Sequence, residues 1–397
     1  MLLEQAINLI TGNTPVLGCQ TVQLKDCFGR VCSENNRARL AVPSYDQSTR
    51  DGYAICGSGR SVGESERCYL IKGEIQAGLC HHLKIGPNEA YRIMTGGLIP
   101  EGTDRIVTQE DCRITDSEVS VAAHQLAIPH RFIRACGCEH QAQETIAETG
   151  TRLNESHLAL LAATGNGSVE VYKRPKVAFF CSGSELVMAD KQLRSGQKIS
   201  SNHYLLDCLI KQVGGSAEGY GVVADDRQEI SLLLQKIIAT DADIIISTGG
   251  VGPGKYDLFN ELLPEEGAEI LYRSLLVRPG RSTLFGIIGN KLYFGLPGPP
   301  PAVNILFQEL ICPALKKMQG IKAYHNQRVS AYLGHKISLK SADVLCFKDA
   351  CYRLERGRII VRYPEKYQTP NCSIMMVPGT TSYNRDDMVT ISLSEPI

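Results

Sequence analysis

The fold class is decided by one segment, DIIISTGGVGPGKY from Asp243 to Tyr256, which runs from an apolar strand directly into a glycine-rich loop. Its expected strand from Ile244 to Ser247 begins with three consecutive isoleucines, as is typical of a short strand that is covered on both faces. In open sheets of parallel strands, ligands bind at the carboxyl ends of the strands, where such a loop begins. The segment therefore predicts a binding loop in an α/β domain.

The loop nearly matches a phosphate-binding P-loop, which needs Gly, four free positions, Gly, Lys and then Ser or Thr. Gly249, Gly254 and Lys255 fit this spacing, but Tyr256 stands where the hydroxyl that holds magnesium should be. Pro253 also removes one of the backbone N–H groups that would cradle a phosphate. We therefore expect an anion-binding loop of another kind, with a P-loop ATPase as the outlying alternative.

The pattern around this loop, from Pro175 to Met318, alternates apolar strands with amphipathic helices. The expected elements are a strand at Val177–Cys181, a helix capped by Asn202 and stopped by Gly214, a helix that starts at Asp226 with Glu229 in a capping-box position, a hairpin around Gly289-Asn290 and a last helix from Pro301 to Gly320. This order predicts a mainly parallel sheet with helices on both faces.

The segments on either side of this block have a different character. Residues from about 46 to 132 show short strands and frequent glycine with little helical periodicity, which predicts a small β-rich domain. Residues from about 323 to 397 alternate apolar and polar positions, which predicts a closed or nearly closed β-domain.

Composition excludes several classes of function. The chain has 42 Lys and Arg residues against 42 Asp and Glu residues, so no global field favours nucleic acid or an acidic membrane. No apolar run reaches the roughly 18 residues that spanning a membrane needs, and the start MLLEQAINLI lacks the pattern of a signal peptide. A cytoplasmic protein is expected.

The 15 cysteines contain no C-x-x-C pair, so the sequence predicts neither a zinc ribbon nor a disulfide framework. The one cluster with metal-ligand character is Cys136-Gly-Cys138-Glu139-His140, which lacks a second pair of ligands nearby. Most of the cysteines are expected to be small buried apolar residues.

Eight segments together resemble one family, the molybdenum insertases of molybdenum cofactor biosynthesis, which include MoeA and the carboxy-terminal domain of gephyrin. The segments are PSYDQSTRDGYAI at Pro43–Ile55, RIMTGGLIPEGTDRIVTQED at Arg92–Asp111, GSEL at Gly183–Leu186, SSN at Ser200–Asn202, ADD at Ala224–Asp226, STGGVGPGKYD at Ser247–Asp257, VRPGRS at Val277–Ser282 and GLPGPP at Gly295–Pro300. They follow the order of the family and run nearly end to end.

The resemblance implies a fold of four domains. The expected parts are a discontinuous N-terminal dimerisation domain of residues 1–45 and 133–172, an inserted β-rich domain of residues 46–132, a three-layer α/β/α molybdopterin-binding domain of residues 173–320 and a β-barrel-like C-terminal domain of residues 321–397. It also implies a homodimer in which Asp51 reaches a site built from residues 182 to 301 of the other subunit.

The implied reaction transfers molybdate to the dithiolene of adenylylated molybdopterin and releases AMP, with magnesium or zinc as the helper ion. The molybdopterin adenylyltransferase is a candidate partner. The acids that resemble the family's catalytic set are Asp51, Glu139, Glu185, Asp225, Asp226 and Asp257, of which Glu185, Asp226 and Asp257 are the expected metal ligands. The expected substrate-binding residues are Thr95, Ser182, Gly183, Asn202, Thr248, Gly249, Gly250, Gly252, Lys255, Arg278, Arg281, Pro297 and Gly298.

Simpler roles compete with these assignments. Asp226 can cap a helix, Asp51 can stabilise a turn, and Gly252 with Gly254 can form a tight turn without a ligand. Arg278 and Arg281 can belong to solvated surface.

Several positions depart from the family pattern. Arg50 stands where Met is common, Gly252 replaces the serine of the substrate loop, and Lys255 stands where an acid is usual. Pro299-Pro300 and Asn371-Cys372-Ser373 also differ from the usual residues. These departures leave open a second function, that of a silent or diverged relative which binds a pterin or scaffolds other proteins.

Overall fold

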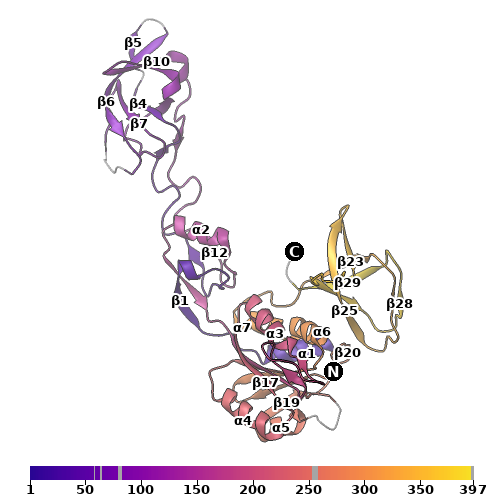
Figure 1. Ribbon diagram of the computed structural model, residues 1–397. Coiled ribbons are helices and arrows are strands. Elements are labelled where there is room, and N and C mark those ends of the chain that lie inside the picture. The colour runs from indigo at the N-terminus through magenta and orange to yellow at the C-terminus, as the bar shows by residue number, and fades with distance from the viewer. Residues whose placement is uncertain (58, 63–64, 79–82, 253–257, 395–397) are drawn as a thin grey trace.

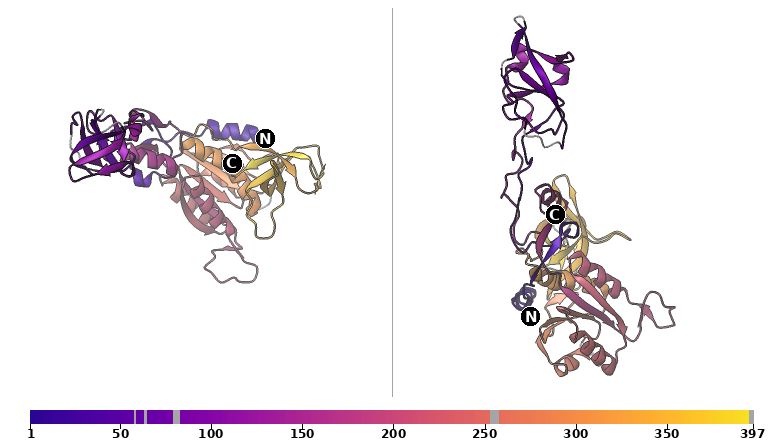
Figure 2. Two further views of the ribbon diagram at one scale, coloured as in Figure 1. Left: turned by 90° about the horizontal axis from the view of Figure 1, so that it is seen from above. Right: turned by 90° about the vertical axis from the view of Figure 1, so that its left-hand side faces the viewer.

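The computed structural model describes residues 1–57, 59–62, 65–78, 83–252 and 258–394. The molecule is elongated, with the inserted β-domain at one end and the α/β and C-terminal domains at the other (Figures 1 and 2). No helix in the described part of the chain is long and apolar enough to cross a membrane.

The first domain is built from two separate parts of the chain. Its elements are β1 (Cys19–Gln23), η1 (Leu24–Asp26), β2 (Asn36–Arg37), β12 (Thr145–Ala147), α2 (Glu155–Ala163) and β13 (Ser168–Tyr172). Antiparallel pairing joins β1 to β13 and β2 to β12, so residues before and after the insertion share one small core around Cys27, Leu161 and Val171.

The first helix, α1 (Leu3–Gly12), lies outside this small core although it falls in the range 1–45. Its buried residues Leu3, Ala6 and Ile10 pack into the core of the α/β domain. The apolar stripe of an amphipathic helix is buried where matching apolar surface is available, and the helical layer of the α/β domain supplies it.

The inserted domain is a curled β-sheet carried on a two-stranded linker. The linker pairs β3 (Gln47–Ser48) with β11 (Ile133–Arg134). The sheet has the order β8-β4-β7-β6-β10-β9, with β5 beside β6. Its elements are β4 (Gly52–Ile55), β5 (Arg60–Val62), β6 (Glu66–Ile75), β7 (Glu89–Ile93), β8 (Arg105–Thr108), η2 (Gln109–Asp111), β9 (Cys112–Ile114), β10 (Glu118–Ala122) and η3 (Ala123–Leu126).

The α/β domain has a six-stranded sheet of order β17-β14-β18-β22-β21-β19. The strands are β14 (Lys176–Ser182), β17 (Ser216–Val223), β18 (Ile244–Thr248), β19 (Ala268–Tyr272), β21 (Leu284–Ile288) and β22 (Lys291–Leu296), and the short pair β15 (Leu186–Val187) and β16 (Lys198–Ile199) lies apart. The first four strands in the order are parallel. Strand β21 runs in the opposite direction because the predicted hairpin at Gly289 joins it to β22, and β19 pairs antiparallel with β21.

Helices cover both faces of this sheet, which confirms the predicted layers (Figure 1). One face carries α1, α3 (Ser201–Gln212), α6 (Pro300–Leu306), the π-helical segment η4 (Phe307–Ile311) and α7 (Cys312–Met318), and the other carries α4 (Arg227–Ile238) and α5 (Phe259–Glu265). Successive strand residues point to opposite faces, so Ile244 and Ile246 lie in one core and Ile245 in the other.

One predicted helix start was wrong. Ser200 is the N-cap of α3, so Asn202 lies inside the first turn and does not cap the helix. Its amide group instead donates to the carbonyl of Gly298, 2.8 Å away. Gly214 follows the end of α3 with φ +92°, as predicted for a helix stop.

The C-terminal domain is a closed sheet, because β25 pairs with both β26 and β27. The elements are β20 (Val277–Arg278), β23 (Arg328–Leu333), β24 (Ile337–Ser338), β25 (Leu345–Glu355), β26 (Arg358–Arg362), β27 (Cys372–Met376), β28 (Ser382–Tyr383) and β29 (Met388–Leu393). The predicted β-barrel is thus confirmed. Strand β20 comes from the loop between β19 and β21 and extends this sheet beside β25.

A buried carboxylate fastens the C-terminal domain to η4. Glu309 is 2% exposed and accepts a hydrogen bond of 2.6 Å from the Ser392 hydroxyl of β29. Arg328 of β23 lies 3.7 Å away, and burial raises the pKa of the Glu309 carboxyl. This network fixes the barrel beside the helical layer that carries α6.

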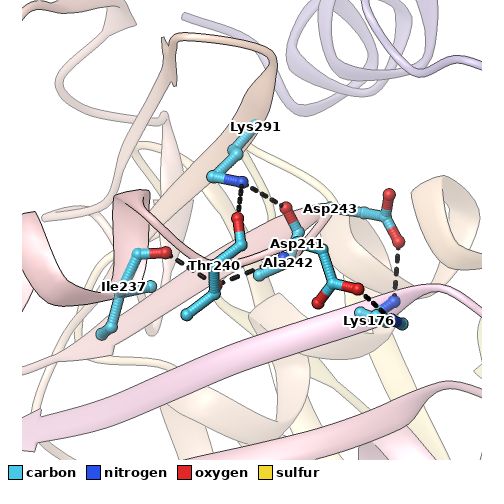
Figure 3. Close-up of polar contacts among 7 residues, drawn as sticks. All are labelled: Lys176, Ile237, Thr240, Asp241, Ala242, Asp243 and Lys291. Atoms are coloured by element: carbon cyan, nitrogen blue, oxygen red, sulfur yellow. Dashed lines mark hydrogen bonds and ion pairs between the residues drawn. The ribbon is translucent and has the colours of Figure 1, made fainter.

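A second polar cluster lies at the amino ends of β14, β18 and β22 (Figure 3). The buried Lys291 Nζ donates to the carbonyls of Thr240 and Ala242 at 2.7 and 2.9 Å, just after α4 ends. Asp243 accepts from the Lys176 backbone N–H at 2.8 Å, and burial raises the pKa of its carboxyl. The cluster thus joins three strands to the C-terminal end of α4, where a cation is favourable.

Replacing Lys291 by Met is expected to lower the unfolding free energy of the α/β domain by about 2 kcal/mol, because two buried carbonyls lose a charged donor. Calorimetry of the domain's transition is the measurement. The matched control is Lys211→Met, which breaks only an exposed ion pair with Asp207 and should cost no more than about 0.5 kcal/mol. Equal shifts for the two variants would contradict the role of Lys291.

Candidate active site

A cleft of about 600 Å³ opens at the carboxyl ends of β14, β18 and β22. Its walls come from the loops after these strands, from β16 and from the first residues of α3 and α6. The lining residues are Ser182, Gly183, Glu185, Leu186, Lys198, Ile199, Ser200, Ser201, Asn202, Asp225, Thr248, Gly249, Gly250, Gly298, Pro299 and Pro300. The cleft therefore occupies the position where α/β sheets bind ligands.

Two glycines set the shape of the loop after β18. Gly249 and Gly250 have φ of +93° and +65°, in the region that favours glycine. A Cβ on Gly249 would overlap the Ser182 carbonyl, and one on Gly250 would lie 2.7 Å from the Phe259 ring. Only glycine therefore lets the loop cross the end of β14 at this distance.

Unpartnered polar atoms lie in the cleft wall. Asn202 donates to the Gly298 carbonyl, yet its Oδ1 is buried without a hydrogen-bond partner among the described residues. The same holds for Ser182 Oγ, and both residues are more than nine-tenths buried. Buried polar atoms are normally satisfied, so these two are suited to a polar ligand.

Two of the predicted acids, Glu185 and Asp225, line the cleft. Asp226 is turned to a structural role, because its Oδ1 accepts the backbone N–H groups of Gln228 and Glu229, each at 2.9 Å, and caps α4. Asp226 thus has the helix-capping role that was the alternative to metal binding, and it is not among the residues that line the cleft.

Three other predicted residues lie far from this cleft in the same chain. Asp51 and Thr95 sit beside the inserted domain, where Asp51 Oδ1 accepts from the Thr95 N–H and hydroxyl, both at 2.7 Å. These two hydrogen bonds lower the pKa of the Asp51 carboxyl. Glu139 forms an ion pair with Arg134 on the linker. Figure 1 shows β4 and β7 at the opposite end of the molecule from β17 and β19.

Of the two predicted arginines, Arg278 faces another cavity, whereas Arg281 is not among the residues that line it. Arg278 lines a space of about 760 Å³ between α6 and the barrel, together with Lys340 and Lys348. Its guanidinium lies 3.7 Å from Asp343. The pKa of the Asp343 carboxyl is lowered, first by the Ser341 hydroxyl and the backbone and then by Arg278 and Arg281.

Four other predicted site residues are not observed in the lining of the cleft. Gly252 and Pro297 are described but are not among the residues that line the cleft. Lys255 and Asp257 lie outside the described residues.

The cleft carboxylates have the chemistry that magnesium prefers, since both supply hard oxygen ligands in the cleft that the glycine-rich loop lines. Within the described ranges, no group of three or more His, Cys, Asp or Glu residues is placed to hold a metal ion. Cys136 and Cys138 are free and exposed. Among the described residues of the cleft, Glu185 and Asp225 are the carboxylates that could hold a metal ion together with substrate oxygens.

The sequence interpretation missed one charged residue of the cleft, Lys198. It lies in β16, two residues before the SSN segment, and lines the wall beside Glu185. The signal available in the sequence was its position just before the SSN segment, which resembles a family motif.

Comparisons with known proteins agree with the domain architecture. Residues 1–165 match the family model for the MoeA N-terminal region, domains I and II, and residues 178–317 match a probable molybdopterin-binding domain. A molybdopterin molybdenumtransferase from Nostoc sp. is 35% identical over 328 residues, which are 80% of this chain and 74% of that protein. The enzyme of the same name from Haemophilus influenzae is 29% identical over 93% of this chain and 92% of its own.

A solved structure has the same architecture. The chain is similar to the molybdopterin biosynthesis MoeA protein from Pyrococcus horikoshii, with a TM-score of 0.84, 25% identity and full coverage of both chains.

Proposed function

Because the chain belongs to the molybdopterin molybdenumtransferase family, we propose that it acts in molybdenum cofactor biosynthesis and transfers molybdate to adenylylated molybdopterin. The observation that carries the proposal is the cleft itself. It combines two carboxylates, Glu185 and Asp225, with atoms of Ser182 and Asn202 that have no hydrogen-bond partner among the described residues, at a glycine-rich loop. This set suits a polar substrate with an anionic group.

The reaction has two balanced parts. Once molybdate is bound, water attacks the AMP phosphorus, the phosphoanhydride P–O bond breaks, and molybdopterin leaves with its own phosphate. The two thiol groups of the dithiolene displace one oxide ligand of molybdate, which leaves as water. Glu185 and Asp225 line the cleft where a water molecule would be oriented and its proton accepted. A magnesium or zinc ion held there would neutralise phosphate charge.

Arg278 supports a place for the second oxyanion. Arg278 lines the cavity beside α6 with Lys340 and Lys348 and with one acid, Asp349, so basic side chains outnumber acidic ones in its lining. Guanidinium and ammonium groups bind tetrahedral oxyanions through charge-assisted hydrogen bonds. We assign molybdate to this side and the adenylylated pterin to the cleft.

The active form is proposed to be a homodimer. Asp51 and Thr95 belong to the matched motifs and Glu139 to the expected acidic set, but none of the three lines the cleft of its own chain. A second chain would bring them there. Phe28 and Leu40 of the first domain are 64% and 53% exposed, and burying them in a symmetric interface is favourable.

The setting and the supplier of the substrate are part of the proposal. Every described cysteine is free, which suits the reducing cytoplasm. The adenylylated pterin is a reactive anhydride, so direct delivery by the molybdopterin adenylyltransferase would protect it from water.

Reconstitution tests the function. The purified protein, adenylylated molybdopterin, molybdate and magnesium should release AMP only when molybdate is present, and the product should activate an apo-molybdoenzyme. AMP release that ignores molybdate would contradict the transfer step. Tight pterin binding without any AMP release would instead support the diverged binder or scaffold.

A further inference from the structure

We propose that Lys198 is the residue that binds the phosphate groups of the nucleotide substrate in the cleft, an inference that rests on the proposed function. Lys198 is the only Lys or Arg among the described residues that line the cleft. A nucleotide anhydride carries negative charge into a wall that already holds Glu185 and Asp225. A cation on that wall therefore decides how tightly the anion binds.

The backbone fixes where this lysine stands. Strand β16 pairs in parallel with β15, and Lys198 lies opposite Leu186 in this ladder. The Lys198 N–H donates to the carbonyl of Glu185, 2.8 Å away. The residue after Ile199 is the N-cap of α3, so the lysine also stands beside the start of that helix, where anions are favoured.

The ammonium group is available for a ligand. Lys198 is exposed and forms no ion pair with any other residue that the structure describes. By contrast, Arg278 is 3.7 Å from Asp343 and lines the cavity beside the barrel. The two oxyanions of the reaction thus have separate cations, Lys198 for the phosphates and Arg278 for molybdate.

The test compares Lys198→Met with Lys198→Arg and with Lys191→Met. Met keeps the apolar stem and removes the charge, whereas Arg keeps the charge. Lys191 is an exposed lysine of the same loop, pairs with Asp190 at 3.7 Å and does not line the cleft, so it controls for a general loss of charge.

Lys198→Met is expected to raise the KM for adenylylated molybdopterin about 10-fold and to leave kcat within about 3-fold, because an exposed charge-assisted contact is lost. Lys198→Arg should restore most of the affinity, and Lys191→Met should resemble the wild type. The KM for molybdate should not change. An unchanged pterin KM in Lys198→Met, or an increase confined to molybdate, would overturn the assignment.

A binding measurement separates this inference from the proposed function. Calorimetric titration with AMP and with adenosine needs no turnover. Lys198→Met should weaken AMP binding about 10-fold and leave adenosine binding unchanged, because only AMP carries the phosphate. If the wild-type protein shows no turnover but still binds AMP about 10-fold more tightly than Lys198→Met does, the proposed function is contradicted and the phosphate-binding role of Lys198 stands. If Lys198→Met weakens AMP and adenosine binding equally, the role of Lys198 alone is overturned.

Discussion

Gly249→Ala is expected to lower cofactor formation by about 100-fold or more, because displacing a loop that positions substrate by about 1 Å has effects of that size. The new Cβ would overlap the Ser182 carbonyl at the end of β14. Relief requires β14 and β18 to separate at their carboxyl ends, where Ser182 and Thr248 line the cleft. The same displacement, together with φ of +93°, should destabilise the α/β domain by about 3 kcal/mol.

The matched control is Gly289→Ala in the hairpin between β21 and β22. Gly289 also has a positive φ, +61°, but no heavy atom lies within 4 Å of an added Cβ among the described residues. Gly289→Ala should lower the unfolding free energy by only about 1 kcal/mol, the cost of a non-glycine residue in the left-handed region, and should leave activity unchanged. Steady-state rates and calorimetry give both quantities. If the two variants behave alike, the crossing of the loop over β14 does not control the site.

The α/β layers were predictable because strand and helix periods are local properties of the sequence. The run Ile244–Ser247 and the stops at Gly214 and Gly289 needed no tertiary information. The position of α1 was not predictable in the same way. The amphipathic pattern of α1 predicts that one face of the helix is buried, but it does not identify the surface that covers this face. That surface lies about 300 residues away along the chain, in α7 and η4.

The candidate site was predictable in part. Glu185, Asp225, Asn202 and the glycines follow strand ends, and parallel strands bring their carboxyl ends to one edge. The sequence could not separate Asp226 from its neighbour, because a carboxylate that caps a helix and one that faces a cleft have the same local pattern. Lys198 was missed because a single lysine carries no periodicity, and only the β15–β16 pairing places it beside Glu185.

The distant location of Asp51 leads to the prediction with the clearest expected contrast. Asp51 is held by Thr95 at the inserted domain, and Glu185 lies in the cleft of the α/β domain at the other end of the molecule (Figure 1). If each site takes Asp51 from one subunit and Glu185 from the other, Asp51→Asn and Glu185→Gln should each lower AMP release about 100-fold or more as pure homodimers.

Mixing these two inactive proteins under conditions of subunit exchange should then restore activity. Half of the dimers become mixed, and each mixed dimer has one site with both changes and one site with neither, so about a quarter of the wild-type activity is expected. Exchange is verified by recovering differently tagged subunits together. The control mixes Glu185→Gln with Asp225→Asn, whose side chains line the same cleft of one chain, so every site keeps one defect and no activity returns. Verified exchange without recovery in the Asp51 mixture would show that the site does not take Asp51 from a second subunit.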